Sequence, residues 1–448
     1  MSDLLSIGAT GVRAYQTALT TVGDNIANTG VAGYSRRTTT LAEVTSVNGI
    51  AGRGVNGSGV TVTGIARQAD AYRASAVRSA GADLARSEAG SVWLERIQTS
   101  LSGNNLADRL TGFFTAARSL AADPTSVPQR AVMLEQAGAL AGAFAATGRQ
   151  LDGATAELDA TARQATEGLN ALGQALVKVN DGLARTGAGG TTAAQLADQR
   201  DQILEQMSAL TDIGVTLDPI GRATVTLGGS GGAGRSTFVV GTDAGHVAYG
   251  RSGGAVSLSV QTGGGFQAFT PVGGALAGIG EGAGRLHDTR ASLDALATDF
   301  TTQVNAAQAA GRDLDGNPGA ALFATGATPT DLSLSLTDPR GIAAAGIGGG
   351  VRDASNLQAL QSLRANRGWE SKLTALTGGN AAALEQRKLV TDAQTTIRDG
   401  AVASQQALSG VDLDNEAVEL LRFQQAYQAS SRVIQVAREV MQSLLEIR

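Results

Sequence analysis

Apolar residues near the N-terminus recur every three, four or seven positions, a spacing that places them on one face of an amphipathic helix. The spacing predicts a helix that ends at Asn28-Thr29-Gly30, because Asn and Gly readily adopt the left-handed backbone that terminates helices. The positions on this face are Leu5, Val12, Tyr15, Leu19, Val22 and Ile26. A face of this kind is stable only when a partner covers it.

The last segment of the chain carries a second stripe of this kind. Asp412 or Asp414 is suited to cap its start, and Glu416 and Glu419 are favourable near the positive end of a helix. The stripe comprises Leu413, Leu420, Phe423, Tyr427, Ile434, Ala437, Met441 and Leu444. The economical arrangement pairs the two terminal helices with each other, or with copies of both in neighbouring subunits.

Helical spacing also dominates the middle of the chain. A heptad pattern runs almost without error from Leu151 to Leu183, and a helix over about 130–186 would be on the order of 80 Å long at about 1.5 Å per residue. The segments 34–70 and 311–350 read instead as loops with irregular or short strands. Further helices are predicted over about 70–102, 191–210, 353–366 and 380–408. These helices predict an elongated rod.

Residues 214–284 differ, because apolar and polar positions alternate there between glycine-rich turns, as in a small antiparallel β domain. Helical spacing resumes between Leu286 and Val304, so the β unit is an insertion in the rod. The predicted fold class is mainly α, with paired N- and C-terminal coiled-coil helices, an elongated helical-bundle rod and a small inserted antiparallel β domain. The expected domains are residues 1–40 with 410–448, residues 41–213 with 285–409, and residues 214–284.

Composition narrows the possible functions. The 448 residues include 60 Gly and 7 Pro with 4% aromatic residues, which predicts closely packed helices and no large aromatic-filled core. The absence of Cys and the presence of only two His exclude disulfides, thiol catalysis and the usual zinc sites. A net charge of −5 argues against nucleic acid as a partner. No apolar run of about 20 residues is present, so we expect neither membrane insertion nor a cleaved signal peptide.

A glycine-rich run suggests two kinds of enzyme site. Gly229–Gly234 matches a dinucleotide-binding pattern, but that pattern needs a following helix, and Arg235–Val240 reads as a strand. The same run contains a G-x-S-x-G pattern around Ser230, so a hydrolase is an alternative interpretation. Its serine would need His246 or His287 as a base and a strand-to-helix turn, and no such turn is visible. A flexible hairpin loop accounts better for the run.

The segment Asp313–Gly319 begins like a calcium-binding loop. The sixth position of such a loop is normally Gly and the twelfth Glu, but Pro318 and Ala324 occupy them here. We therefore expect an Asx-rich turn. The sequence predicts no catalytic residue, no cofactor and no metal site.

Several stretches resemble proteins of the bacterial flagellum. Asn25–Arg36 resembles the N-terminal signature shared by flagellar rod, hook and hook-associated proteins. The resemblance to the FlgK-type family of hook–filament junction proteins lies in Leu196–Leu204, Gly280–Phe300 with the Asp313–Gly319 turn, Ser409–Glu416, Leu421–Ser430 and the ending Ile447-Arg448. A hook or distal-rod subunit is the alternative, since the N-terminal signature alone fits it. A coiled-coil signalling module would leave the β insertion unexplained.

This resemblance implies a structural protein and not an enzyme. Its terminal helices would assemble into an inner tube, as a ring of copies placed between the hook protein and a second junction protein. The chain would reach this extracellular position through the flagellar type III export apparatus, escorted by an export chaperone. The expected assembly residues are Leu5, Val12, Tyr15, Leu19, Val22, Ile26, Leu420, Phe423, Tyr427, Ile434, Met441 and Leu444. The chaperone candidates are Phe423, Tyr427, Ile434, Met441 and Leu444, because they would otherwise form an exposed apolar stripe.

Overall fold

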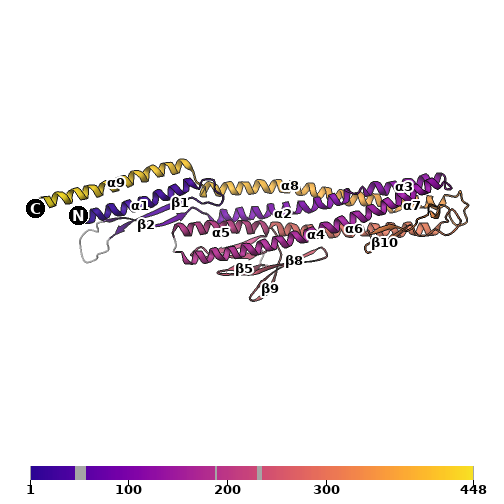
Figure 1. The fold of residues 1–448 in the computed structure, drawn as a ribbon, viewed down its shortest axis with the longest axis horizontal. Helices are drawn as coiled ribbons and strands as arrows, with labels where there is room; N and C mark the ends of the chain where they lie inside the picture. Colours follow the sequence, from indigo (N-terminus) through magenta and orange to yellow (C-terminus); the bar gives the residue numbers. More distant parts are fainter. Residues whose placement is uncertain (1, 46–56, 187–188, 230–234, 447–448) are drawn as a thin grey trace.

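The computed structural model describes residues 2–45, 57–186, 189–229 and 235–446. It confirms the mainly α fold class, and Figure 1 shows an elongated molecule with both termini at one end. The helices are α1 (Ser2–Ala27), α2 (Ala71–Ser102), α3 (Leu106–Ala122), α4 (Val127–Arg185), α5 (Thr191–Leu210), α6 (Gly274–Ala310), the short 3-10 helix Pro339–Gly341, α7 (Ser355–Arg367), α8 (Trp369–Ser409) and α9 (Leu413–Glu446).

The strands are short and antiparallel. They are β1 (Arg37–Thr45), β2 (Gly57–Arg67), β3 (Ile213–Leu217), β4 (Ala223–Leu227), β5 (Ser236–Val240), β6 (Asp243–Ala244), β7 (His246–Ser252), β8 (Ala255–Thr262), β9 (Gly265–Phe269), β10 (Phe323–Thr325) and β11 (Leu332–Leu334). The described strands pair as β1-β2, β3-β4-β5-β6, β7-β8-β9 and β10-β11.

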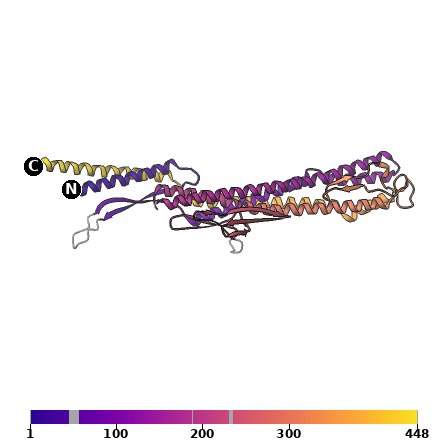
Figure 2. The same cartoon turned by 60° about the horizontal axis from the view of Figure 1, so that its bottom comes forward.

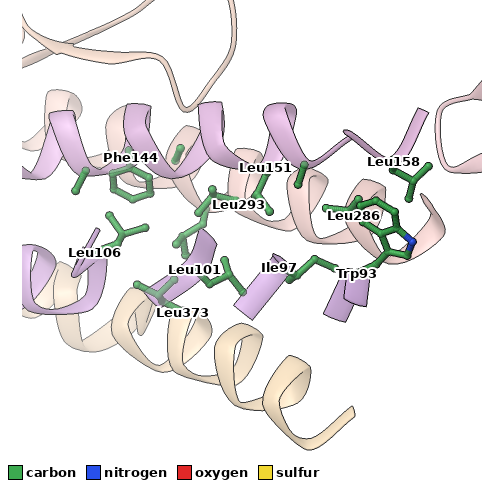
Figure 3. Packing of buried hydrophobic residues seen from close by; sticks show 14 of the residues in the cluster. Trp93, Ile97, Leu101, Leu106, Phe144, Leu151, Leu158, Leu286, Leu293 and Leu373 are labelled. Atoms are coloured by element: carbon green, nitrogen blue, oxygen red, sulfur yellow. The ribbon is translucent and has the colours of Figure 1, made fainter. Parts of the chain in front are cut away.

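The rod is built around the long helices α2, α4, α6 and α8. The predicted heptad of α4 is buried, because Leu151, Leu158, Leu169 and Leu176 are fully covered. Figure 3 shows α4 leucines facing leucines of α6, with aliphatic side chains of α2 and α8 close by. Ser126 caps α4 by accepting a hydrogen bond from the Gln129 amide at 3.4 Å. The helix predicted over about 130–186 is one continuous element, α4, of 59 residues.

The expectation that the protein lacks an aromatic core is wrong. Six rings gather near the end of the rod far from the termini, from Phe113, Phe114, Phe144, Phe300, Phe323 and Trp369. The Phe300 and Trp369 rings are nearly perpendicular, with centroids 5.3 Å apart. The Trp369 indole N–H donates to the Asp299 carboxylate at 2.8 Å. Overall composition misleads here because five of the nine phenylalanines and one of the two tryptophans are concentrated in one place.

The inserted β unit consists of two small sheets along one side of the rod, as Figure 2 shows. Its expected end at residue 284 is too late, because α6 already begins at Gly274. Glycines at the start of α6 hide the helical pattern, yet they allow close packing: a Cβ atom at Gly282 would lie 2.5 Å from the Trp93 ring. The β unit is held against α4 by the buried Asn180, whose amide donates to the Ala223 carbonyl at 2.9 Å.

The segment expected to hold irregular strands and loops forms a hairpin of β1 and β2, which is paired from Arg37 opposite Arg67 onwards and whose register shifts after Thr40 and after Glu43. The expected domain boundary at residue 40 falls inside β1. The hairpin lies along α1 (Figure 1), and the Thr39 and Thr21 hydroxyls are hydrogen-bonded at 3.0 Å. The β1–β2 hairpin therefore belongs with the terminal helices and not with the rod. Residues 46–56 at its tip lie outside the described part of the chain.

Candidate assembly site

The two terminal helices α1 and α9 pack against each other, as the stripes predicted. They approach closely at Gly8 and Gly11. A Cβ atom at Gly8 would lie 2.6 Å from Ile434 Cγ1, and one at Gly11 would lie 2.6 Å from the Ser430 hydroxyl. Further along, the Tyr15 and Phe423 rings have their centroids 6.3 Å apart. Small residues thus set the helix separation, and larger side chains pack beside them.

Most of the predicted assembly residues are only partly covered in a single chain. Val22 is buried and Met441 is exposed, while the Leu444 side chain lies outside the described residues. The half-buried ones are Leu5, Val12, Tyr15, Leu19, Ile26, Leu420, Phe423, Tyr427 and Ile434. The fully buried face of α1 instead carries Gly8, Gly11, Ala14, Ala18, Thr21, Val22 and Asn25. Apart from Val22, the predicted stripe of large apolar residues does not include this face, although its small residues have a helical spacing of their own.

Helix α9 has a second apolar face that the stripe analysis did not identify. At 3.6 residues per turn, this face points away from Phe423, Tyr427 and Ile434. We call it the outer face of α9, and it consists of Val418, Leu421, Val433, Val436 and Val440. Each of these side chains is more than a third exposed. No other described element covers them, which is unusual for valine and leucine at such density.

Asn25 joins the end of α1 to the start of α9. Its amide group donates to the Glu416 carboxylate at 3.0 Å and to the Arg37 carbonyl at 2.8 Å. Its side-chain oxygen accepts from the Tyr34 hydroxyl at 2.8 Å and from the Arg37 backbone N–H at 3.0 Å. Arg36 adds an ion pair with Glu416 at 2.6 Å. Both Asn25 and Glu416 are fully buried, so the N- and C-terminal signatures meet in one network.

A second network joins this region to the rod. Asp198 of α5 pairs with Arg37 and Arg67, each at a nitrogen–oxygen distance of 3.0 Å. Arg67 also pairs with Asp201, which in turn accepts from Arg200 at 2.9 Å. We call the two networks together the joint. The internal stretch Leu196–Leu204 is thus brought to the same place as both terminal signatures.

Burial shifts the pKa values of two groups in the joint. The pKa of the Asp198 carboxyl is raised because its burial outweighs the opposing influence of Arg67 and Arg37. Burial also raises the pKa of the Tyr34 phenol, although the Arg37 guanidinium lies 4.7 Å from its ring centre. The joint is therefore a buried polar assembly in which nearly every charge has a partner. Apart from Glu416, which is expected near the start of the last helix, the sequence patterns do not single out the polar residues of the joint.

The structure gives no support to the enzyme interpretations. Ser230 lies outside the described residues. His246 begins β7, whereas His287 lies on α6 against the Gly253-Gly254 turn. Asp313 accepts hydrogen bonds from the amides of Asp315 and Asn317, which makes the 313–319 segment an Asx-type turn. Among the described residues no cluster of three metal-ligating groups occurs, and no described helix is long and apolar enough to span a membrane.

Comparisons with known proteins agree with these features. A family model described as the flagellar hook-associated protein FlgK helical domain matches residues 94–323, slightly more than half of the chain. A second model, the flagellar basal body rod FlgEFG protein C-terminal, matches residues 404–447.

Curated relatives carry the same name. Flagellar hook-associated protein 1 of Salmonella typhimurium is 27% identical over 75% of this chain, which spans 63% of that protein's length. The protein of that name in Bacillus subtilis is 23% identical, over 96% of this chain and 95% of its own. The flagellar hook junction protein FlgK from Burkholderia pseudomallei has a similar fold, with a TM-score of 0.50 and 24% identity over 56% of this chain and 47% of that one. This chain belongs to the family of FlgK-type flagellar hook-associated proteins.

Proposed function

We propose that this chain is a structural protein of the bacterial flagellum that forms the junction between hook and filament, and that it is not an enzyme. The observation that carries the proposal is the pair of terminal helices, which is joined by a buried polar network to a long rod. Family membership supports the same role. Because both termini lie at one end (Figure 1), copies side by side would bring their terminal helices together while the rods point away.

Self-assembly would use the outer face of α9. The inner face of α9, with Phe423 and Ile434, already packs on α1 within one chain. The outer face has no partner in that chain, and burying its valines against a neighbour would gain about 1.5–3 kcal/mol for each side chain that becomes fully covered. A ring of copies would therefore form through the outer face. The half-buried residues of α1, such as Leu5 and Val12, would complete these contacts.

Before assembly, an export chaperone would cover the inner face of α9. Its predicted contacts are Phe423, Tyr427, Ile434, Met441 and Leu444. In the folded chain α1 already contacts two of them, Phe423 and Ile434, and would compete with the chaperone. The type III export apparatus would then deliver the chain to an extracellular position next to the hook protein and the second junction protein. Chaperone binding and self-assembly would thus involve different faces of the same helix.

A comparison of variants on the two faces tests this assignment. Val433→Asp with Val436→Asp should abolish ring formation and leave chaperone affinity unchanged, because a charge buried at a subunit contact is strongly unfavourable. Phe423→Asp with Ile434→Asp should weaken chaperone binding. The matched control is Gln424→Asp, an exposed position on α9 that lies between the two faces. Assembly would be measured by electron microscopy and chaperone affinity by calorimetry. Normal assembly of the Val433 and Val436 variant would overturn the outer-face contact.

Labelled antibody on isolated flagella tests the location. A single band of label at the boundary between hook and filament is the expected result. Label along the whole hook would instead identify a hook subunit, and label below the hook a distal-rod subunit.

A further inference from the structure

A cavity of about 650 Å³ lies beside the joint, between the first turns of α2, the middle of α5, strands β3 and β4, and the last turns of α8. Arginines predominate among the charged side chains that line its described part: Arg67, Arg73, Arg78, Arg200 and Arg235 face only Asp70 and Asp201. The wall therefore carries a clear excess of positive charge. Cavities of this size accommodate small ligands.

The two acidic residues are already engaged. The Asp70 carboxylate caps α2 by accepting from the backbone amides of Tyr72 at 2.7 Å and Arg73 at 3.1 Å. Asp201 pairs with both Arg67 and Arg200. Arg73 donates to the Ser404 carbonyl. Arg78 alone of these arginines forms no hydrogen bond or ion pair with any residue that the structure describes.

Arg78 is half-buried at the cavity wall. Desolvation lowers its pKa, and the nearby positive charge of Arg200 acts in the same direction, whereas Asp201 and Glu205 oppose it. A partly desolvated charge without a bonded partner is unfavourable, and a guanidinium is well shaped to bind phosphate or carboxylate oxygens in pairs. The Arg78 guanidinium therefore retains donors that no described acceptor satisfies.

We propose that this cavity binds a small anion with two or more negative charges, of the phosphate or polycarboxylate class, with Arg78 as its principal contact. A neighbouring cavity of about 720 Å³ also touches Arg78, but Asp201, Glu205 and Asp412 outnumber the arginines of its described wall, so the anion belongs in the first. The bound anion would connect α2 to α5 beside the joint. This inference is independent of the proposed role at the hook.

Titration of the full chain with inorganic pyrophosphate tests the proposal, with citrate as the polycarboxylate probe and sodium chloride at matched ionic strength as the blank. We expect saturable binding at one site and a ligand-dependent rise in thermal midpoint. Arg78→Met should weaken binding at least tenfold. Arg109→Met is the control, because Arg109 is exposed on α3 towards the opposite end of the rod.

Arg235→Gln is a second variant at the cavity wall, and it should weaken pyrophosphate binding without changing the thermal midpoint of the free protein. Binding that does not saturate, or that Arg78→Met leaves intact, would mean an adventitious ion only and would overturn the proposal. If Arg78→Met lowers the thermal midpoint in anion-free buffer while Arg109→Met does not, Arg78 is a structural partner of Asp201 and Glu205. That outcome would also overturn the proposal.

Discussion

The rod and the terminal helix pair bury their side chains in different ways. In the rod, Phe113, Phe114 and Phe300 are completely covered by residues of the same chain. In the terminal pair, glycines set the closest contact, Phe423 is only half-buried, and the outer face of α9 is exposed. The rod therefore covers its core within one chain, whereas the terminal helices retain apolar surface that other chains can cover. The buried polar joint connects these two kinds of packing.

The same substitution in the two regions should show the largest difference. Phe300→Ala should reduce the free energy of unfolding by about 3–5 kcal/mol, because it leaves a cavity among tightly packed rings. Phe423→Ala should cost the isolated chain only about 1 kcal/mol, since half of the side chain is already in water. Denaturant titration followed by circular dichroism measures both. Equal losses would show that the terminal pair is as firmly packed as the rod.

Breaking the joint should have the next largest effect. Glu416→Ala leaves Arg36 without its ion-pair partner and removes one acceptor from the buried Asn25 amide, which should destabilise the pairing of α9 with α1 by about 2–3 kcal/mol. Hydrogen exchange in α9 should accelerate while exchange in the rod core stays unchanged. Glu439→Ala, an exposed position on the same helix, is the control. Faster exchange throughout the rod would contradict the view that the two regions are energetically separate.

Weakening the attachment of the β unit to the rod should cost less stability than breaking the joint. Asn180→Ala removes the hydrogen bonds to the Ala223 amide and to the carbonyls of Ala223 and Gly241, at a cost of about 1–2 kcal/mol. Amide exchange should increase in β4 and β5 but not in the leucine core of α4. Unchanged exchange in these strands would show that apolar contacts alone hold the β unit.

The smallest effects concern pH, and they have opposite signs for Asp198 in the joint and Asp159 in the rod. The raised pKa of Asp198 in the joint means that the folded protein binds this proton first, so its contribution to stability improves as pH falls through the folded pKa. The hydrogen bond from Arg251 lowers the pKa of Asp159 on α4, so its contribution is present above the unfolded value of about 3.9 and is lost below it.

Asp198→Asn and Asp159→Asn separate the two contributions. The stability of the parent relative to Asp198→Asn should rise between neutral pH and about pH 4, and that relative to Asp159→Asn should fall as pH drops below about 4. Denaturant titrations at a series of pH values measure both differences. The same sign for both variants would contradict the assigned environments.

Local periodicity was sufficient for the long helices, because every turn repeats the same burial requirement. The expected 191–210 helix coincides with α5, and the Leu151–Leu183 heptad lies buried in α4. The start of α6 and the tight α1–α9 contact were missed because they depend on glycines. A glycine weakens a helical pattern while permitting close approach, and only the neighbouring helix reveals which effect operates.

The sequence by itself determined the mainly α architecture, the pairing of the ends and the family resemblance, since heptads and short signatures depend on residues close together along the chain. Only the tertiary structure decided that Asn25, Arg37, Asp198 and Glu416 meet in one joint, that α9 has an outer face, and that Arg78 faces an arginine-rich cavity. Residues hundreds of positions apart, such as Asn25 and Glu416, become neighbours only through the packing of the helices that carry them, because hydrogen bonds and ion pairs depend on distance in space.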